Sequence, residues 1–299
     1  MTISKRVLVT GLNGFTGRYM QAELETAGFE VFGIGEAPST KAGYFQANLT
    51  DVHSLRKALA SVRPHIVIHL AGIAFVGNAD AQAFYAVNTV GTRNLLEAIA
   101  QEAKDIECVL LASSANVYGN TTGGELDESV TPNPANDYAV SKLAMEYIAR
   151  LWFDRLPIVI CRPFNYTGIG QSDAFLLPKI VNHFKRGACE IELGNIDVFR
   201  DFSDVRAVVN AYRRLVELRP AGTIVNVSSG ITHSLKGVIS IMSEVAGYAI
   251  EVKVNPAFVR ANEVLTLSGS PVYLRSLIGG WASPPLRETL EWMYRSAAT

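Results

Sequence analysis

A tyrosine and a lysine four residues apart, Tyr138 and Lys142, form the most reactive pair that the sequence offers. At this spacing two side chains share one face of a helix. An ammonium beside a phenol favours the phenolate, so we expect Lys142 to lower the pKa of Tyr138 from about 10 toward neutral pH. Ser114 ends the run LLASS and supplies a hydroxyl for the same substrate oxygen. Such a trio can move a proton to or from a carbonyl or alcohol oxygen while a nicotinamide exchanges hydride.

A glycine-rich segment near the N-terminus, GLNGFTG at residues 11–17, stands between an apolar run and an amphipathic stretch. Gly11 permits a tight turn, Gly14 lets the backbone approach a pyrophosphate, and Gly17 allows a helix to pack closely on a strand. The first N–H groups of that helix add positive potential for an anion. The segment therefore predicts a dinucleotide site.

The residues after the second apolar run bear on the choice between NAD and NADP. A carboxylate at the end of that strand would hydrogen-bond a ribose that has no 2′-phosphate. Gly35 stands in the usual place of this carboxylate, and Glu36 follows one residue late. Arg18 either faces a 2′-phosphate or is an ordinary solvated helix arginine. The sequence therefore leaves NADH and NADPH open.

Short apolar runs alternate with longer amphipathic stretches through much of the chain, and the runs are apolar on both faces, as in parallel sheets. Strands are predicted at residues 6–11, 29–35, 65–72, 107–114, 157–164 and 223–230. Helices are predicted at residues 16–27, 51–62, 81–103, 138–156, 177–186, 205–218 and 235–245. This order predicts an α/β fold with a Rossmann-type doubly wound parallel sheet and a smaller C-terminal lobe. We expect residues 1–164 to bind the dinucleotide and residues 165–299 mainly to bind the substrate, with some segments returning to the sheet.

Composition narrows the class of protein further. Of the 299 residues, 48% are hydrophobic and 18% charged, and the 27 basic and 28 acidic side chains give a net charge of −1. Near-neutrality disfavours nucleic acid and anionic membranes as partners, and no apolar run is long enough to predict a membrane span. Cys108, Cys161 and Cys189 have no metal or redox spacing. We expect a cytoplasmic protein without a metal site or a signal peptide.

Six motifs follow one another along the chain: GLNGFTG, IHLAG, VNTVGT, SSANVYG, YAVSK and RPFN. In this combination the chain resembles the extended short-chain dehydrogenases/reductases, a family of nucleotide-sugar epimerases, dehydratases and reductases, over essentially its whole length. The resemblance implies that Ser114, Tyr138 and Lys142 are catalytic and that Asn88 is a scaffold residue. It also implies that NADPH or NADH contacts Gly11, Asn13, Gly14, Phe15, Thr16, Gly17, Arg18, Asn48, Leu49, Leu70, Ala71, Gly72, Tyr138, Lys142 and Phe164.

The segment LGNIDVFRDF, residues 193–202, resembles a segment of family members that act on GDP-mannose derivatives. The resemblance implies that Arg200 and Arg260 bind the nucleotide diphosphate, for which the fork of guanidinium donors is suited. It further implies that Glu263 accepts from ribose hydroxyls and that Asn165 contacts the sugar diphosphate. The predicted GDP-sugar site also includes Ser114, Asn116 and Lys179.

Two departures from the family's motifs narrow the range of possible reactions. Family dehydratases carry a carboxylate two residues after the serine, where this chain has Asn116, and an amide cannot remove a proton. GDP-fucose synthases carry a cysteine next to the serine, where this chain has Ala115. Hydride transfer at C4 remains, and the motifs are most similar to those of reductases that convert GDP-4-dehydro-6-deoxy-D-mannose to GDP-D-rhamnose.

Three other functions stay open at this point. They are a nucleotide-sugar C4 epimerase with tightly bound NAD, a reductase that gives GDP-6-deoxy-D-talose, and a non-catalytic dinucleotide-binding regulatory protein. The five histidines show no ligand spacing, and only His183 lies near the predicted substrate loop. By analogy with the family, we expect a homodimer that pairs the helices at residues 81–103 and 138–156.

Overall fold

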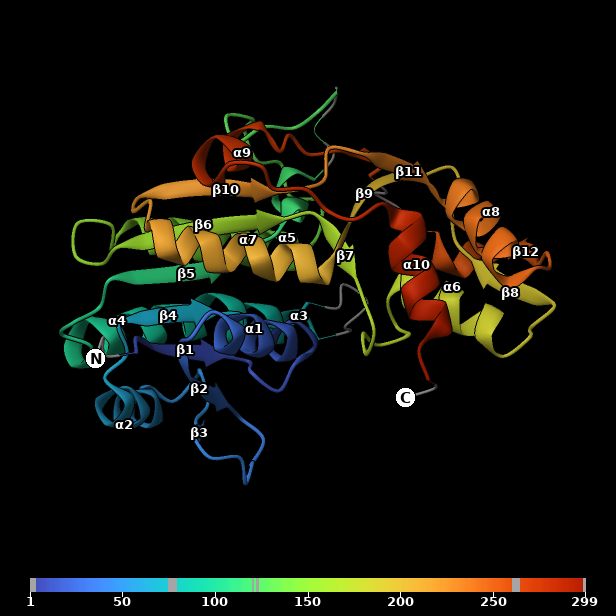
Figure 1. Cartoon of the computed structure of the whole chain (residues 1–299). Helices are drawn as coiled ribbons and strands as arrows, with labels where there is room; N and C mark the ends of the chain where they lie inside the picture. Colours follow the sequence, from blue (N-terminus) through green and yellow to red (C-terminus); the bar gives the residue numbers. More distant parts are fainter. Residues whose placement is uncertain (1–3, 75–79, 120, 122–123, 260–263, 298–299) are drawn as a thin grey trace.

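A seven-stranded parallel sheet forms the centre of the computed structural model, which describes residues 4–74, 80–119, 121, 124–259 and 264–297 (Figure 1). Its strand order is β10-β6-β5-β4-β1-β2-β3. The strands are β1 (Arg6–Thr10), β2 (Glu30–Gly35), β3 (Tyr44–Gln46), β4 (Ile66–His69), β5 (Cys108–Ala112), β6 (Ile158–Pro163) and β10 (Thr223–Val227). The order reverses between β1 and β4, which is where doubly wound sheets bind ligands. The predicted fold class is confirmed.

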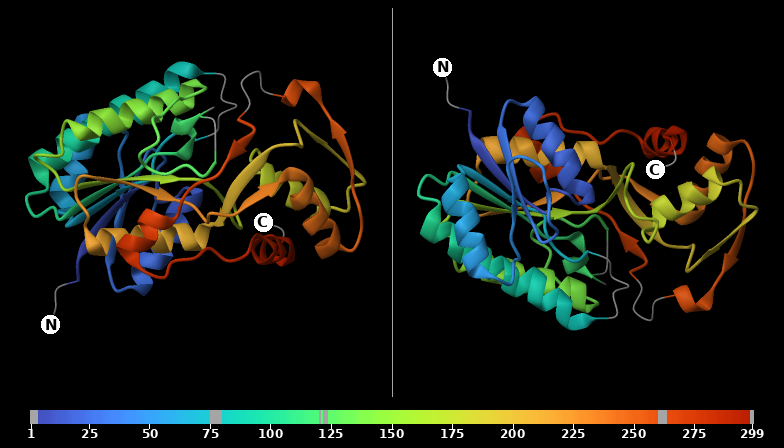
Figure 2. Two further views of the ribbon diagram at one scale, coloured as in Figure 1. Left: turned by 90° about the horizontal axis from the view of Figure 1, so that it is seen from above. Right: turned by 90° about the horizontal axis from the view of Figure 1, so that it is seen from below.

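Helices cover both faces of this sheet (Figure 2). On one face α1 (Phe15–Thr26) packs beside α7 (Val205–Leu218) over a core that includes Val9, Met20 and Tyr212. The other face carries α2 (Val52–Val62), α4 (Thr92–Glu102) and α5 (Asp137–Arg150), while α9 (Val272–Ile278) packs against α7 and β10. None of the helices in the described parts of the chain is long and apolar enough to cross a membrane.

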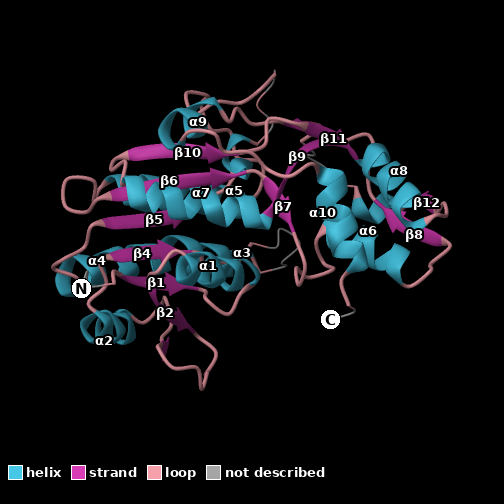
Figure 3. Ribbon diagram, viewed as in Figure 1, coloured by secondary structure: helices cyan, strands magenta, loops and turns pink. Residues whose placement is uncertain are grey.

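A smaller lobe lies beyond the carboxyl ends of β6 and β10 (Figure 3). Its own apolar core includes Phe184, Val238 and Leu290. The lobe contains α6 (Leu176–Lys185), α8 (Leu235–Ala246), α10 (Leu286–Arg295), β8 (Glu190–Leu193) and β12 (Glu251–Val254). A second small sheet joins it to the main body through β7 (Asn165–Thr167), β9 (Phe199–Asp204), β11 (Thr232–Ser234) and β13 (Thr266–Leu267).

Two predicted elements differ from the observed ones. The predicted helix at residues 138–156 ends at Arg150 and continues as turns to the residue before Pro157, where the proline disfavours helical backbone. The predicted helix at residues 81–103 is built from α3 (Ala81–Phe84), a π-helical segment (Tyr85–Gly91) and α4. Such π-helical segments frequently occur at functional sites.

Candidate active site

The three residues that follow one another at the end of β5, residues 112–114, hold three side chains of α5. The Lys142 ammonium donates to the carbonyl oxygen of Ala112 at 2.8 Å, and the Ser113 hydroxyl donates to Glu146 at 2.6 Å. The third residue, Ser114, hydrogen-bonds the Tyr138 phenol. Tyr138, Lys142 and Glu146 are each four residues apart, so they share one helix face. The structure therefore brings the predicted trio together at the carboxyl edge of the sheet.

Burial governs the proton affinities of this trio. Burial raises the pKa of Tyr138 to about 12, and the hydrogen bond with Ser114 only partly opposes it. Burial also lowers the pKa of Lys142 to about 8, while the Glu146 carboxylate acts in the opposite direction. The predicted net lowering of the Tyr138 pKa toward neutral pH is thus wrong for this structure, because desolvation of the buried phenol, which favours its neutral form, outweighs the influences that lower its pKa. At neutral pH Tyr138 is a protonated acid.

Asn88 links α5 to the segment that follows β4. Its amide oxygen accepts from the backbone N–H of Ile73 at 2.9 Å, and its amide nitrogen donates to the Ser141 hydroxyl at 3.1 Å. A Cβ atom on Gly72 would lie 2.8 Å from the Asn88 oxygen and 3.3 Å from the Lys142 nitrogen. The glycine is therefore needed for the close approach of this segment to the lysine.

His69 is a residue of this region that sequence reasoning missed. Its imidazole is 1% exposed and lies 2.7 Å from the hydroxyl of Thr10 and 3.0 Å from that of Thr92. The Thr92 hydroxyl donates to the carbonyl of Asn88, so it accepts from the imidazole, which is neutral. Burial lowers the pKa of His69 to about 3. His69 thus links β1 and β4 to Asn88 through hydrogen bonds. In the sequence, only its position in the motif IHLAG indicated that it belongs to this region.

The glycine segment forms a cradle that side chains would fill. A Cβ atom on Gly17 would lie 2.2 Å from the Gly11 carbonyl oxygen, and one on Gly11, whose φ is +73°, would lie 3.0 Å from the Ala71 backbone. Helix α1 begins at Phe15 without a side-chain cap and without an acidic residue in its first turn. Its first N–H groups are therefore well placed for the diphosphate of a dinucleotide.

Two other predicted cofactor residues contact β7 and the segment that follows it. The Thr16 hydroxyl lies 2.9 Å from that of Tyr166. Arg18, an exposed residue, donates to the carbonyl of Gly170 at 3.1 Å. The guanidinium therefore bridges α1 to the start of the small lobe, a role that neither sequence interpretation of Arg18 included.

The end of β2 supplies a carboxylate to the adenine side of the predicted cofactor site. Asn48 donates to the Glu36 carboxylate at 3.1 Å, and Leu49 beside it is 8% exposed. A Cβ atom on Gly35 would lie 2.2 Å from the Tyr44 hydroxyl, so a larger residue there would require the Tyr44 side chain to move. The remaining predicted cofactor residues all follow carboxyl ends of main strands: Asn13, Gly14, Leu70, Ala71 and Phe164.

The pairing of β7 with β9 brings two predicted substrate residues together. Arg200 lies on β9 and donates to the backbone carbonyls of Phe199 at 2.8 Å and Leu265 at 3.1 Å. Asn165 lies on β7 and donates to the carbonyl of Asp201 at 3.5 Å. Both side chains thus lie on the strands that connect the two lobes.

The other predicted substrate residues are more scattered. Lys179 on α6 donates to the carbonyl of Glu192 at 2.7 Å and lies 4.7 Å from the centre of the Phe258 ring. Lys179 therefore stays inside the small lobe. Arg260 and Glu263 lie outside the described residues.

Asn116 and His183 complete the set of residues singled out from the sequence. Asn116 is half-buried on a short 3₁₀ turn, and its backbone N–H donates to the Ser114 hydroxyl at 3.2 Å. His183 lies at the end of α6, 2.7 Å from the carbonyl of Lys179, and its second ring nitrogen accepts from Arg186. Burial lowers the pKa of His183. Both ring nitrogens are therefore engaged within the small lobe.

Comparison with known proteins agrees with this geometry. Residues 7–228 match the NAD dependent epimerase/dehydratase family. A GDP-6-deoxy-D-talose 4-dehydrogenase of Aggregatibacter actinomycetemcomitans is 34% identical over 97% of both chains. A GDP-6-deoxy-D-mannose reductase of Pseudomonas aeruginosa is 33% identical over 96% of this chain and 95% of its own.

Solved structures show the same fold. A putative epimerase from Burkholderia cenocepacia has a TM-score of 0.91 and 54% identity over 97% of both chains. RMD from Pseudomonas aeruginosa, complexed with NADPH, has a TM-score of 0.85 and 31% identity over 97% of this chain and 98% of its own. The chain belongs to the NAD-dependent epimerase/dehydratase family of extended short-chain dehydrogenases/reductases, and it is an NAD(P)-dependent enzyme. The predicted family, enzyme class and cofactor class are confirmed.

Proposed function

We propose that this enzyme reduces the C4 ketone of GDP-4-dehydro-6-deoxy-D-mannose to give GDP-D-rhamnose. One observation carries the proposal: a buried, protonated Tyr138 stands with Ser114 and Lys142, while an amide occupies the position of Asn116. This arrangement supplies an acid for a carbonyl oxygen but no base for a sugar C–H bond. The names of the two curated relatives support a GDP-6-deoxyhexose as the substrate.

In the proposed mechanism the chain holds the sugar and delivers one proton. NADPH or NADH, when bound on the glycine cradle, supplies the hydride that reduces C4 and is itself oxidised. The Ser114 hydroxyl positions the C4 oxygen, and the Tyr138 hydroxyl gives that oxygen its proton. The Lys142 ammonium lies one helical turn further on, where its charge stabilises the phenolate left behind.

The small lobe would bind the nucleotide. In this proposal Arg200 and Arg260 contact the diphosphate, Glu263 accepts from ribose hydroxyls, and Asn165 and Lys179 border the sugar diphosphate. Residues 1–164 would bind the cofactor, and most of residues 165–299 the substrate. An arginine fork suits a diphosphate because it donates two parallel hydrogen bonds.

A second product has a specific observation in its favour. The relative from Aggregatibacter actinomycetemcomitans is named for GDP-6-deoxy-D-talose. The talo and rhamno alcohols differ in the face of the ketone that receives hydride, and both use the same acid. We therefore keep GDP-6-deoxy-D-talose as the alternative product.

One incubation tests the proposal and its alternatives. The purified enzyme is given GDP-4-dehydro-6-deoxy-D-mannose with NADH or with NADPH, and the product is identified by NMR. GDP-D-rhamnose supports the proposal, and GDP-6-deoxy-D-talose supports its alternative. An enzyme that carries stoichiometric NAD and turns over nucleotide sugars without added cofactor would be a C4 epimerase. Dinucleotide binding without any turnover would indicate a regulatory protein.

We also propose that the enzyme forms a homodimer through α5 and the neighbouring π-helical segment. Val140, Tyr147 and Leu151 are exposed at positions seven and four residues apart, so they share one face, and Val90 is exposed on the adjacent segment. A second copy would cover this apolar face. Light scattering should show a dimer that Leu151→Asp converts to a monomer, whereas Leu218→Asp at the exposed end of α7 should leave it intact. A monomeric wild-type protein would contradict the proposal.

The three cysteines bear on the location of the enzyme. Cys108 and Cys161 are buried and Cys189 is exposed, and all three are free thiols. Free thiols persist in the reducing cytoplasm. We propose a cytoplasmic location, which fractionation of the cells that make the protein would test.

A further inference from the structure

Behind the catalytic trio lies a buried ion pair that the proposed mechanism does not use. Arg162 on β6 donates to both carboxylate oxygens of Glu146 on α5, at 2.9 and 2.6 Å. The exposed fractions of the two side chains are 2% and 0%. Burying two charges costs free energy that a pair recovers only with good geometry and further hydrogen bonds. Hydrophobic side chains could fill the same space without this cost, so the presence of the ion pair calls for a functional explanation.

The ion pair hydrogen-bonds residues of the same elements that carry Ser114, Tyr138 and Lys142. Glu146 accepts from the Ser113 hydroxyl, next to Ser114, and lies one turn after Lys142 on α5. Arg162 also donates to the Tyr118 hydroxyl at 2.9 Å, at the end of the 3₁₀ turn that Ser114 begins. The pair thus links the end of β5, the turn after it and the catalytic helix.

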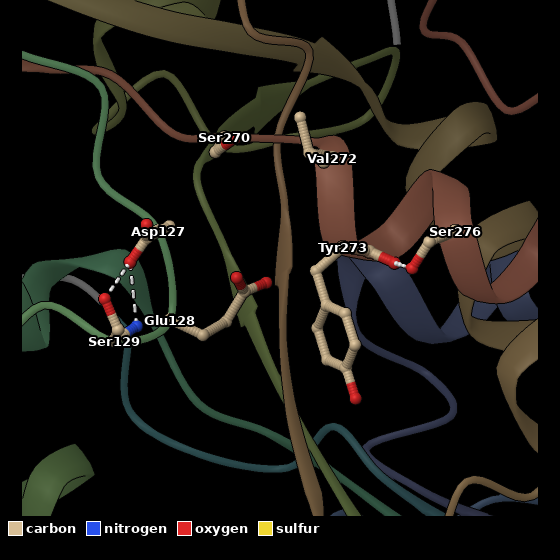
Figure 4. A pocket seen from close by; sticks show the side chains of 7 residues that line it. All are labelled: Asp127, Glu128, Ser129, Ser270, Val272, Tyr273 and Ser276. Atoms are coloured by element: carbon tan, nitrogen blue, oxygen red, sulfur yellow. Dashed lines mark hydrogen bonds between the residues drawn. The ribbon is translucent and has the colours of Figure 1, made fainter.

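The outer end of the network is equally fixed. The Tyr118 hydroxyl donates to the side chain of Asn226 on β10 at 2.8 Å, and the Asn226 backbone N–H donates to the Glu128 carboxylate at 2.7 Å. Figure 4 shows Glu128 pointing into an open hollow between Asp127 and Tyr273. Arg162 therefore cannot move away from Glu146 without also breaking its hydrogen bond to Tyr118.

We propose that Glu146, held in place by Arg162, is a positioning residue that fixes the Lys142 ammonium against β5 and keeps it charged. This inference rests on the proposed function, in which that charge stabilises the Tyr138 phenolate. Among the described residues, Lys142 interacts electrostatically with Glu146 on its own helix and with His69 on β4, and Tyr138 lies one turn earlier on α5. Burial keeps His69 and Tyr138 neutral near pH 7, so Glu146 is the carboxylate that supports the ammonium.

The direction of the effect can be worked out from these charges. Burial lowers the pKa of Lys142 to about 8, and the Glu146 carboxylate resists this fall. Replacing Glu146 by glutamine removes the supporting charge and leaves the Arg162 cation unpaired nearby. Both changes disfavour the ammonium, so the pKa of Lys142 should fall further. Replacing Arg162 as well removes the added repulsion and should return part of the shift.

The test compares wild type with Glu146→Gln, the double variant Glu146→Gln/Arg162→Met, and the surface control Glu102→Gln. The titration of Lys142 is followed by NMR of labelled lysine side chains, with Lys142→Arg used to assign the signal. This readout needs no sugar substrate, so it stands even where the proposed function fails. We expect the midpoint to fall by about one pH unit or more in Glu146→Gln, which corresponds to a tenfold change in proton affinity. The double variant should fall less, and Glu102→Gln should match wild type.

Kinetics provide the second readout. If the reductase proposal holds, the alkaline limb of the kcat profile should move down with the Lys142 midpoint in Glu146→Gln, and activity should recover at lower pH. A uniform loss of kcat with an unmoved limb would show a merely structural role and overturn the proposal. An unchanged Lys142 midpoint in a folded Glu146→Gln would overturn it as well. If Glu146→Gln alone does not fold, the Lys142 midpoint is measured in the double variant, and an unchanged midpoint there would overturn the proposal.

Discussion

For single residues, the protonation of the proposed catalytic centre depends on burial more than on neighbouring charges. Tyr138 is 6% exposed, and burial raises its pKa to about 12. A phenol of this kind stays protonated across the physiological range, which suits an enzyme that gives a proton to a ketone oxygen. A protonated Tyr138 is therefore consistent with the proposed reduction.

Replacing Tyr138 by phenylalanine should abolish turnover while cofactor binding survives. Only the proton donor is lost, and the loss of a general acid costs about 10²- to 10⁴-fold in rate. Steady-state kinetics and NAD(P)H binding by fluorescence check both halves of the prediction. Tyr147→Phe, on an exposed tyrosine of the same helix, serves as the matched control. Activity of Tyr138→Phe within a few-fold of wild type would remove Tyr138 from the mechanism.

Replacing Arg200 by alanine should raise KM for the nucleotide sugar more than it lowers kcat. A diphosphate contact is present in both the ground state and the transition state, so its loss is mainly a loss of binding. A hydrogen bond to a charged group contributes about 1.5–3 kcal/mol, which corresponds to a rise in KM of roughly 10- to 150-fold. Arg56→Ala, which breaks a surface ion pair with Glu102, is the control. An unchanged KM in a folded Arg200→Ala would mean that the diphosphate binds elsewhere.

At the scale of elements, two short segments set the geometry of the site. The turn between β1 and α1 is fixed by glycines that have no space for a side chain. Strand β9 is fastened by the buried Asp201 carboxylate, which accepts from the Ser229 and Gly230 backbone N–H groups at 3.0 and 2.8 Å. The cofactor cradle and the strand that carries Arg200 are thus both held by backbone contacts.

Replacing Gly17 by alanine should weaken NAD(P)H binding at least tenfold and lower the melting temperature. The new methyl group would lie 2.2 Å from the Gly11 carbonyl oxygen and 2.5 Å from that of Leu12, so α1 must move away from β1. The first N–H groups of α1 would move with it. Cofactor titration and thermal unfolding measure the two effects. Gly280→Ala adds the same methyl group in open space and should change neither. Normal cofactor affinity in Gly17→Ala would argue against the cradle.

At the scale of the whole molecule, the small lobe faces the carboxyl edge of the sheet, and the proposed substrate lies between the two. The segment at residues 113–116 presents hydroxyls, a methyl and an amide, none of which is a base near neutral pH. His183 of the small lobe has both ring nitrogens engaged, one by the Lys179 carbonyl and the other by Arg186. These features agree with the proposed delivery of hydride and a proton at one carbon.

Reduction in D₂O with ordinary NADPH or NADH should therefore give a 6-deoxyhexose with unchanged configuration at C3 and C5. No solvent deuterium should enter either carbon beyond an enzyme-free control, because no described residue of the segment next to Ser114 can remove those protons. Mass spectrometry and NMR of the product measure the incorporation. Enzyme-dependent deuterium at C3 or C5, or an L-fucose product, would identify an epimerase–reductase instead.

Patterns in the sequence were sufficient to predict the features that depend on local physics. The strand and helix periods predicted the doubly wound sheet, and the spacing of Tyr138 and Lys142 placed them on one helix face. The glycines at residues 11–17 predicted the turn because their conformational demands follow from backbone sterics alone. The end of the helix at Arg150 is the local feature that the periodicity missed, since the apolar pattern runs on into the turns before Pro157.

The proton affinities and the supporting hydrogen-bond network depend instead on how distant parts of the chain pack together. The pKa of Tyr138 depends on everything that excludes water from its phenol, and those groups come from distant parts of the chain. The hydrogen bonds of His69 to Thr10 and Thr92 span 59 and 23 residues. The pairing of Glu146 with Arg162 likewise requires α5 to dock on β6. Desolvation and long-range pairing are properties of the packed molecule, so no periodicity or motif in the sequence specifies them.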